Sequence, residues 1–394
     1  MIKKTKLALI NLLLLISINS YAQKDFRAGF IITHESDTIQ GMVDYRSNTK
    51  NYESCIFKGK EGEKKYYPNQ ILGFGYQNDK LFSSQIIEGT FVEVLVTGKI
   101  SLYKSKDLYH AKKGTDLIDL KSSVKQVTID GKVGVKETSN WRGSLTYLIS
   151  DCIENPSKIT SSIQYSEKSL TRLFIQYNSC MGEEFTEPKA DQPWTKFEYG
   201  ILFGVSKSEI NFSGEYLYTY LPSSYSSVDP TIGIQLAISS PRFTDRIAFQ
   251  SELHFTKSSY SSFIETTSPI NYFDTYVDIN TLSIPLSLKY SFPEKKYGFY
   301  LQVGLNVDVL LSKQARLLEE RVYDDAVFTY PETTAFEMKS NQIGYWGGIG
   351  VLRSFEKFKA GLTVRYTQMS ELTDSPNYTA SINRLSVNLV VVKK

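Results

Sequence analysis

Long apolar runs are almost absent from this chain. The longest is Leu7–Ile18, and nothing after it is long enough for a membrane-spanning helix. Lys3, Lys4 and Lys6 precede that run, and Ser20-Tyr21-Ala22 follows it as a small-x-small cleavage site. This order predicts a secretory signal peptide over residues 1–22. Any membrane insertion of the mature chain must therefore use strands.

Net charge is also nearly absent. The chain has 45 Lys and Arg against 42 Asp and Glu, and removing the three lysines of the predicted signal peptide leaves 42 of each sign. Proteins that bind nucleic acid carry a strongly basic surface. The balance therefore argues against nucleic acid as a partner.

Histidine is scarce, with three residues in the whole chain. His34, His110 and His254 each lack a second histidine, a cysteine or a carboxylate pair at metal-ligand spacing, so we expect no metal and no cofactor. No G-x-S-x-G nucleophile elbow occurs, and we predict no catalytic residue. Gly73-Phe74-Gly75 lacks the spacing of a phosphate loop and predicts a bulge or bend instead.

The three cysteines are equally few. An exported protein meets an oxidising compartment, so two of them can pair. Cys152 and Cys180 bracket a helical segment, and a disulfide between them would leave Cys55 over. Three buried thiols are the alternative, because connectivity cannot be deduced from sequence.

What the chain does contain is a regular series of strands in its second half. Eight alternating runs lie near 194–206, 231–239, 246–257, 279–291, 297–310, 342–354, 358–368 and 382–392. The gaps between them alternate in length. The short gaps are Ser240–Asp245, Phe292–Lys296 and Phe355–Lys357, and the long ones are Lys207–Pro230, Ser258–Asp278, Leu311–Asn341 and Met369–Ser381. This pattern is typical of an outer-membrane β-barrel with tight periplasmic turns and longer outer loops.

The alternation within each run supports this interpretation. In Tyr297–Val309, every second residue from Phe299 to Val307 is apolar, and the residues between them are mostly polar. Aromatic residues gather at the strand ends beside the short gaps, where a membrane interface is expected. We predict an eight-stranded antiparallel transmembrane barrel over residues 194–394. A soluble β-sandwich is the alternative.

The interior of the predicted barrel carries charges of both signs. Glu252 and His254 lie two apart on one strand, so both point inward. Other inward residues include Glu198, Lys289, Asp308, Arg365 and Arg384. A small barrel is filled by its side chains, so we interpret the set as a paired ionic core with Lys289 or an inward arginine beside Glu252. The alternative is an acid/base pair of an outer-membrane lipid hydrolase or acyltransferase, for which no nucleophile is evident.

The first half predicts a small β-domain over residues 23–140 and a helical pair over residues 141–182. Strand-like runs lie at Ala28–Thr33, Thr38–Tyr45, Glu53–Phe57, Ile71–Tyr76, Phe91–Thr97, Ile100–Tyr103 and Val124–Ile129. Polar turns predict hairpins across Glu35–Asp37 and Gly98-Lys99, and Lys58–Lys65 predicts a solvated hairpin tip. Pro156 separates the two helices, and Ser166 is the expected N-cap of the second. Residues 183–193, which are polar and contain two prolines, predict a linker.

These features together resemble a class of envelope proteins from Bacteroidota. The resemblance is carried by Gly29–Ile32, Asp37–Gly41, Val43–Arg46, Tyr67-Pro68, Ile71–Phe74, Ser150–Cys152 and Tyr177–Cys180. It implies a signal peptide, an N-terminal β-domain and a C-terminal PorT-like outer-membrane barrel. Such proteins mostly have no assigned function, so the resemblance implies architecture rather than activity.

Three functions are compatible with the sequence. The first is a non-enzymatic protein whose barrel sits in outer-membrane lipid while its N-terminal domain meets an envelope protein or glycan in the periplasm. The second is a component of an envelope secretion machine, and the third is a lipid-modifying enzyme built on Glu252 and His254. We favour the first. The sequence does not reveal the oligomeric state.

Overall fold

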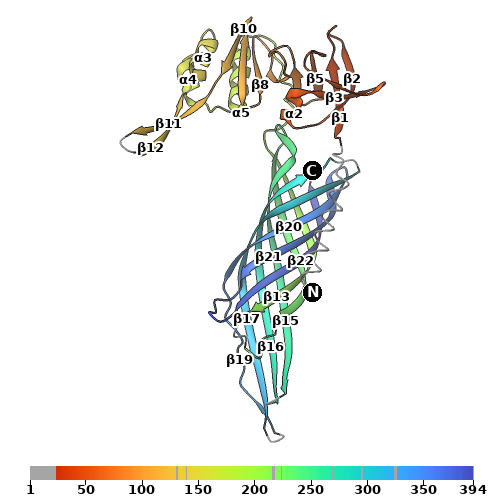
Figure 1. Cartoon of the computed structure of the whole chain (residues 1–394), viewed down its shortest axis with the longest axis vertical. Coiled ribbons are helices and arrows are strands. Elements are labelled where there is room, and N and C mark those ends of the chain that lie inside the picture. Colours follow the sequence, from red (N-terminus) through yellow and green to blue (C-terminus); the bar gives the residue numbers. More distant parts are fainter. Residues whose placement is uncertain are drawn as a thin grey trace. The chain divides into compact units, whose positions relative to one another are not determined.

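The computed structural model describes residues 24–129, 132–138, 140–214, 218–222, 224–267, 270–293, 296–323 and 326–393. The predicted signal peptide, residues 1–22, lies outside the described residues. The chain forms two compact units that meet in the sequence between Trp194 and Thr195. The fold is mainly β, as predicted (Figure 1). Within the described ranges, no helix has both the length and the apolar character needed to span a membrane.

The N-terminal unit is built on a ten-stranded antiparallel sheet. Its strands follow the order β10-β9-β8-β7-β6-β5-β1-β2-β3-β4. They are β1 (Phe26–Ile32), β2 (Thr38–Asp44), β3 (Cys55–Gly59), β4 (Gly62–Tyr66), β5 (Gly73–Tyr76), β6 (Leu81–Ser83), β7 (Val92–Val96), β8 (Ile100–Ser105), β9 (Leu108–Lys113) and β10 (Asp116–Leu120). A separate hairpin pairs β11 (Ser123–Ile129) with β12 (Lys132–Thr138).

Both predicted hairpins are confirmed, since β1 pairs with β2 and β7 pairs with β8. The sequence did not predict β4, β6, β9, β10 or β12. The segment Lys58–Lys65 was predicted as a solvated hairpin tip. The tip itself is shorter, because β3 and β4 run into this segment and pair as far as Gly59 and Gly62. β4 and β10 are the two edges of the sheet. Edge strands tolerate charged residues, which also protect them from pairing with other chains, so both lack the apolar alternation of inner strands.

The predicted bulge at Gly73-Phe74-Gly75 is wrong, because these residues form the regular strand β5 between β1 and β6. Close packing explains the glycines. A Cβ atom on Gly73 would lie 2.5 Å from the carbonyl oxygen of Phe82, and one on Gly75 would lie 2.8 Å from the ring of Phe30.

The predicted helical pair is in fact three helices, after the short α2 (Asn48–Glu53) of the β-domain. They are α3 (Asn140–Ile149), α4 (Pro156–Ser162) and α5 (Glu167–Cys180). Pro156 does not merely separate two helices but starts α4, where its missing N–H costs nothing. Ser166 caps α5 as expected, since its side chain accepts a hydrogen bond from the N–H of Ser169.

Two large apolar cores and a smaller cluster of Val92, Val94 and Tyr103 hold this unit together. Helices α3 and α5 pack on the β7–β10 half of the sheet, around buried residues that include Leu102, Trp141, Leu145, Phe174 and Tyr177. The β1–β6 half has its own core, which includes Ile31, Val43, Tyr52, Phe74 and Phe82. The helices bury their apolar stripes against strands, as a one-sided amphipathic helix must.

Residues 183–193 are more than the predicted linker, because they pack on the N-terminal unit. Thr186 and Thr97 exchange two backbone hydrogen bonds of 2.9 Å. The Lys189 side chain is buried, and Gln192 donates a hydrogen bond to the carbonyl of Asn78. We call residues 186–192 the strap.

The C-terminal unit is a closed ring of eight antiparallel strands, which confirms the predicted barrel. The strands are β13 (Lys196–Ser213), β14 (Ser224–Ser240), β15 (Thr244–Thr267), β16 (Ile270–Ser291), β17 (Tyr297–Tyr323), β20 (Asn341–Ser354), β21 (Phe358–Glu371) and β22 (Thr379–Lys393). The ring closes because β13 pairs with both β14 and β22. The short strands β18 (Ala326–Thr329) and β19 (Thr333–Thr334) add to β17.

An apolar band surrounds the part of the barrel next to the short turns. Its outward side chains include Phe203, Ile234, Leu253, Val303 and Leu389, all substantially exposed. Aromatic rings at Phe243, Phe292, Phe299, Phe355 and Phe358 mark the short-turn end of the band. Lys207 and Lys257 mark its other end.

The predicted long outer loops are largely wrong, because the strands continue through them. β15, β16 and β17 reach 24, 22 and 27 residues, against about 10 needed to cross a bilayer. Figure 1 shows these strands running well past their neighbours. We call the described residues of 207–230, 258–278, 311–341 and 369–381 the distal extension. Strands that continue beyond a membrane still alternate, but their apolar residues point inward and their polar residues point outward. The polar outward residues resemble those of loops, so the sequence predicted loops here.

Candidate functional site

The candidate site inside the barrel centres on Glu252 of β15. Its two neighbours along the inner face are Gln250 and His254, while Leu253 and Phe255 point outward. Arg365 reaches Glu252 from β21 with two parallel bonds, Nη1 to Oε2 at 2.7 Å and Nη2 to Oε1 at 3.0 Å. Both side chains are almost fully buried. A bidentate pair of this kind is the strongest form of charged hydrogen bond in proteins.

The remaining acceptor positions of Glu252 are also used. His254 Nε2 lies 2.6 Å from Oε2, and Gln250 Nε2 donates to Oε1 at 2.6 Å. Each carboxylate oxygen therefore has two partners. A general base needs a free lone pair facing its substrate, and Glu252 has none to spare in this arrangement.

The other predicted inward residues lie inside the barrel but in separate contacts. Arg384 pairs with Asp308, and Asn306 donates to the same carboxylate at 2.6 Å. Lys289 does not bind Glu252. Its Nζ lies 4.4 Å from the centre of the Tyr300 ring. Glu198 forms an ion pair with Lys196 near the short-turn end.

The space around this ionic layer is small. A cavity of about 30 Å³ is lined by His254, Ser283, Arg365, Arg384 and Asn388, among others. That volume holds one or two water molecules and no lipid substrate. Inside the barrel this cavity lets the site pair charges but holds no acyl chain or sugar. A larger apolar groove of about 760 Å³ also borders Glu252, but the exposed side chains of Ile201, Ile234 and Leu253 line it, so it lies on the outer face of the barrel.

The distal extension seals the interior on its outer side. Its inward residues form a continuous apolar core that includes Phe212, Tyr260, Val277, Leu317 and Phe336. The barrel thus changes character along its axis. Within the apolar band its outside is apolar and its inside polar, and beyond the band the inside is apolar and the outside polar, as for any protein surrounded by water.

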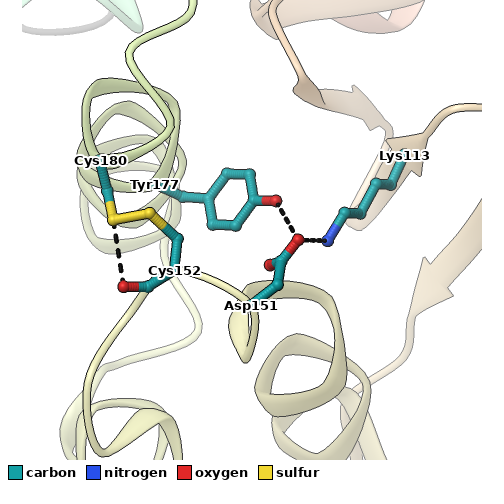
Figure 2. The surroundings of a disulfide bond; sticks show 5 residues. All are labelled: Lys113, Asp151, Cys152, Tyr177 and Cys180. Carbon is teal, nitrogen blue, oxygen red and sulfur yellow. Dashed lines mark hydrogen bonds and ion pairs between the residues drawn. A yellow bond between two sulfur atoms is a disulfide. The ribbon is translucent and has the colours of Figure 1, made fainter.

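In the N-terminal unit, Cys152 and Cys180 form a disulfide that joins the end of α5 to the segment after α3 (Figure 2). Their Cα atoms are 6.1 Å apart, which is normal for a bridge. Figure 2 shows Asp151 beside it, where the carboxylate accepts hydrogen bonds from Tyr177 and Lys113. Cys55 is buried and unbridged, and burial raises the pKa of its thiol to about 12. These contacts suit a structural site rather than a redox one.

The sequence did not reveal a serine, histidine and aspartate that meet on β8, β9 and β10. His110 Nε2 lies 2.7 Å from Ser105 Oγ, and its Nδ1 lies 2.8 Å from Asp119 Oδ1. The connectivity is that of a hydrolytic triad. His110 is only 2% exposed, so it fits a buried structural contact between the three strands. Two unpredicted strands carry His110 and Asp119, so no local sequence signal could have joined them.

A second unpredicted cluster buries four charged groups under the strap. Lys189 Nζ donates to Glu93 Oε1 at 2.6 Å and to Glu167 Oε1 at 2.5 Å, and Lys104 reaches Glu167 Oε2 at 3.1 Å. Burial works to lower the pKa of Lys189, but the carboxylates of Glu93 and Glu167 outweigh it and hold that pKa above its usual value. Burial likewise works to raise the pKa of Glu167, and the two lysines hold it below its usual value.

A closed eight-stranded barrel with an apolar band defines a membrane β-barrel protein. Residues 184–374 match the family model described as the outer membrane protein beta-barrel domain. The protein is therefore an outer-membrane β-barrel protein, and the outer membrane is its location.

Three solved structures of low sequence identity are similar to about half of this chain. They are Neisserial surface protein A (13% identity, 48% of this chain and 95% of that one, TM-score 0.23), the outer membrane protein OprG from Pseudomonas aeruginosa (11%, 51% and 95%, TM-score 0.29), and Ail, the attachment invasion locus protein of Yersinia pestis (9%, 49% and 97%, TM-score 0.23). No curated protein matches the chain.

Proposed function

We propose that the protein is a non-enzymatic outer-membrane component whose barrel, held in outer-membrane lipid, anchors a periplasmic interaction domain. The observation that carries the proposal is the filled barrel interior. Glu252 is saturated by Arg365, His254 and Gln250, and an apolar core closes the distal side. Such a barrel supplies attachment rather than passage or catalysis. The domain's partner is an envelope protein or glycan.

The course of the chain supports a periplasmic N-terminal unit. The strap leads into β13 at Lys196, and that end of β13 pairs beside the short turn between β14 and β15. Short turns of outer-membrane barrels face the periplasm. The resemblance to Bacteroidota proteins with a PorT-like barrel fits this arrangement and stays a prediction.

Epitope tags at two positions test the proposal in whole cells. One tag goes into the β3–β4 turn at Lys60-Glu61, and the other follows Pro331 in the distal extension. We expect antibody to reach the second tag on intact cells and the first only after the outer membrane is permeabilised. Cross-linking of the same cells should attach envelope protein or glycan to the N-terminal unit. A β3–β4 tag reached on intact cells, or cross-links confined to the barrel, would contradict the proposal.

A further inference from the structure

The outward face of the distal sheet is unusual for a surface in water. Here β15, β16, β17 and β18 lie side by side, and their pairing sets rows of outward residues. Two complete rows are Phe263–Asp274–Leu318 and Glu265–Tyr272–Glu320–Thr329, and beyond them lie the pairs Thr267–Ile270 and Val322–Val327. The inward partners on the same strands, such as Phe273 and Leu317, belong to the apolar core. This outward set, which we call the distal face, has no such cover within the described residues.

Large apolar side chains stand exposed on the distal face. Phe263 is 59% exposed, Val327 58% and Ile270 41%. The rings of Phe263 and Tyr272 stack with their centres 6.1 Å apart and their planes 16° from parallel. Apolar groups gathered on an otherwise polar surface mark a contact site for another molecule.

The charges on the distal face have one sign. Glu265, Asp274 and Glu320 are its charged residues, and these rows and pairs contain no lysine or arginine. The nearest cation in the adjoining row is Arg316, which is already paired with Asp278 at 3.2 Å and with Glu332 at 3.8 Å. In the part of the chain that the structure describes, no three acidic side chains converge to hold a metal ion. The face is thus complementary to a cation carried by a partner.

The register places that cation at Tyr272. Glu265 and Glu320 are the direct cross-strand neighbours of Tyr272 on its two sides. Neighbouring strands lie about 5 Å apart, so both glutamates stand beside Tyr272 within reach of a partner cation. In the free protein Glu320 Oε1 accepts a hydrogen bond from Thr329 at 3.3 Å. A cation over an aromatic face within about 6 Å of its centre is attracted by the ring, and the two carboxylates add to that attraction.

We propose that the distal face docks a partner protein through a lysine or arginine side chain seated over Tyr272 between Glu265 and Glu320. Phe263, Ile270 and Val327 supply the apolar contacts around it. This interaction lies on the distal extension and is independent of the periplasmic role proposed above. The aromatic ring and the paired carboxylates favour a cationic protein segment over a neutral glycan, because a neutral sugar leaves the charges unmatched.

Binding of a lysine peptide to the full-length protein tests the proposal. The probe is a fluorescent 12-residue peptide of alternating lysine and alanine, and its control is the same peptide acetylated on every lysine. The protein is held in phosphatidylcholine nanodiscs, whose net charge is zero, and fluorescence anisotropy reports binding. We expect the lysine peptide to bind, the acetylated peptide not to bind, and the affinity to fall with added salt.

Matched variants decide where the peptide binds. E265Q/E320Q should weaken binding about fivefold to tenfold, as expected for two exposed charge pairs. E209Q/E371Q removes the same charge elsewhere on the distal extension and should leave binding within about twofold. Y272A should weaken binding, while Y272F keeps the ring and should not.

A shift in gel mobility on heating should verify that every variant forms the barrel. If Y272A does not fold, the comparison of E265Q/E320Q with E209Q/E371Q still tests the proposal, because glutamine has nearly the shape of glutamate. Equal affinities for E265Q/E320Q and E209Q/E371Q would overturn the proposal. So would equal losses in Y272A and Y272F, or binding of a neutral oligosaccharide in place of the lysine peptide.

Discussion

At the scale of single residues, Glu252 shows how the barrel tolerates charge. A carboxylate this deeply buried is costly unless it is paired and fully hydrogen-bonded. Arg365 supplies the charge, and His254 and Gln250 complete the bonding. Arg365 is in turn supported by Trp346, whose ring centre lies 3.9 Å from its Cζ. The ion pair of Glu252 and Arg365 therefore connects β15 and β21, which lie on opposite sides of the barrel.

We expect E252Q to destabilise the barrel without changing any lipid. The substitution keeps the shape of the side chain but leaves Arg365 buried without a counter-ion, which costs roughly 3–5 kcal/mol in severe cases. Denaturant unfolding of the detergent-folded protein would measure this. E209Q removes an exposed partner of Lys207 and should cost at most about 1 kcal/mol. Unchanged stability, together with loss of a lipid modification seen by mass spectrometry, would favour an enzyme.

At the scale of elements, the strap is the piece that completes the N-terminal unit. Glu93 stands on β7, Glu167 starts α5, and Lys104 stands on β8. Lys189 enters from the strap and binds both carboxylates with its own side chain 3% exposed. Without Lys189, Glu167 would keep its contact with Lys104, and Glu93 would lose the lysine that contacts it at 2.6 Å. The strap is thus held by charge as well as by its bridge to Thr97.

We expect K189M to loosen β7 and α5 by at most roughly 3–5 kcal/mol, because Glu93 and Glu167 both lose the buried lysine that bridges them, while Glu167 keeps Lys104. Hydrogen exchange with mass spectrometry of the full chain would measure the opening of peptides from both elements. K99M serves as the control, since Lys99 and Glu183 form an exposed pair at 3.5 Å that contributes at most about 1 kcal/mol.

The pH dependence of this stabilisation follows from the pKa shifts. Glu167 has a lowered pKa, so its contribution is present above the unfolded value of about 4.3 and is lost as the pH falls through the folded pKa. Lys189 has a raised pKa, so its contribution is full below about 10.4 and is lost as the pH rises through the folded pKa. The gap between wild type and K189M should therefore be widest near neutral pH. A gap of the same size in strong acid would contradict the ionic explanation.

At the scale of the whole C-terminal unit, a closed and filled barrel has two consequences. Each strand of the ring is paired on both sides within the band, so no strand edge is left for detergent to attack. Among the described residues, the ionic layer and the apolar core fill successive parts of the interior, so we expect no ion conduction along the axis.

We expect the purified protein to run faster on an unheated gel than on a heated one and to show no steady conductance in planar bilayers. The closed barrel stays folded in detergent without heating, which explains the faster mobility. Its interior is filled by side chains, which explains the absence of conductance. Recovery as a soluble periplasmic protein, or stepwise channel currents from the wild type, would contradict this description.

Period-2 alternation is a local property, so the sequence by itself determined the number of barrel strands, which residues point inward, and the apolar band. The predicted hairpins of the first half were equally local, each set by one turn. The sequence did not predict β4 and β10, because edge strands lack the apolar alternation. It did not predict the strands of the distal extension either, because their outward residues are mostly polar, as in loops.

Only the tertiary structure decided which residues meet. Closing the ring brings Arg365 to Glu252 across 113 positions of sequence, and the strap brings Lys189 to Glu93 across 96. The distal face likewise exists only because β15, β16 and β17 continue to pair beyond the apolar band, with a register shift between β16 and β17 at Asn280 and Thr281. The alternation of apolar and polar residues determines on which side of the sheet each side chain lies. Which other side chain it contacts depends on the registers of the strand pairs around the ring, and contacts distant in sequence set those registers.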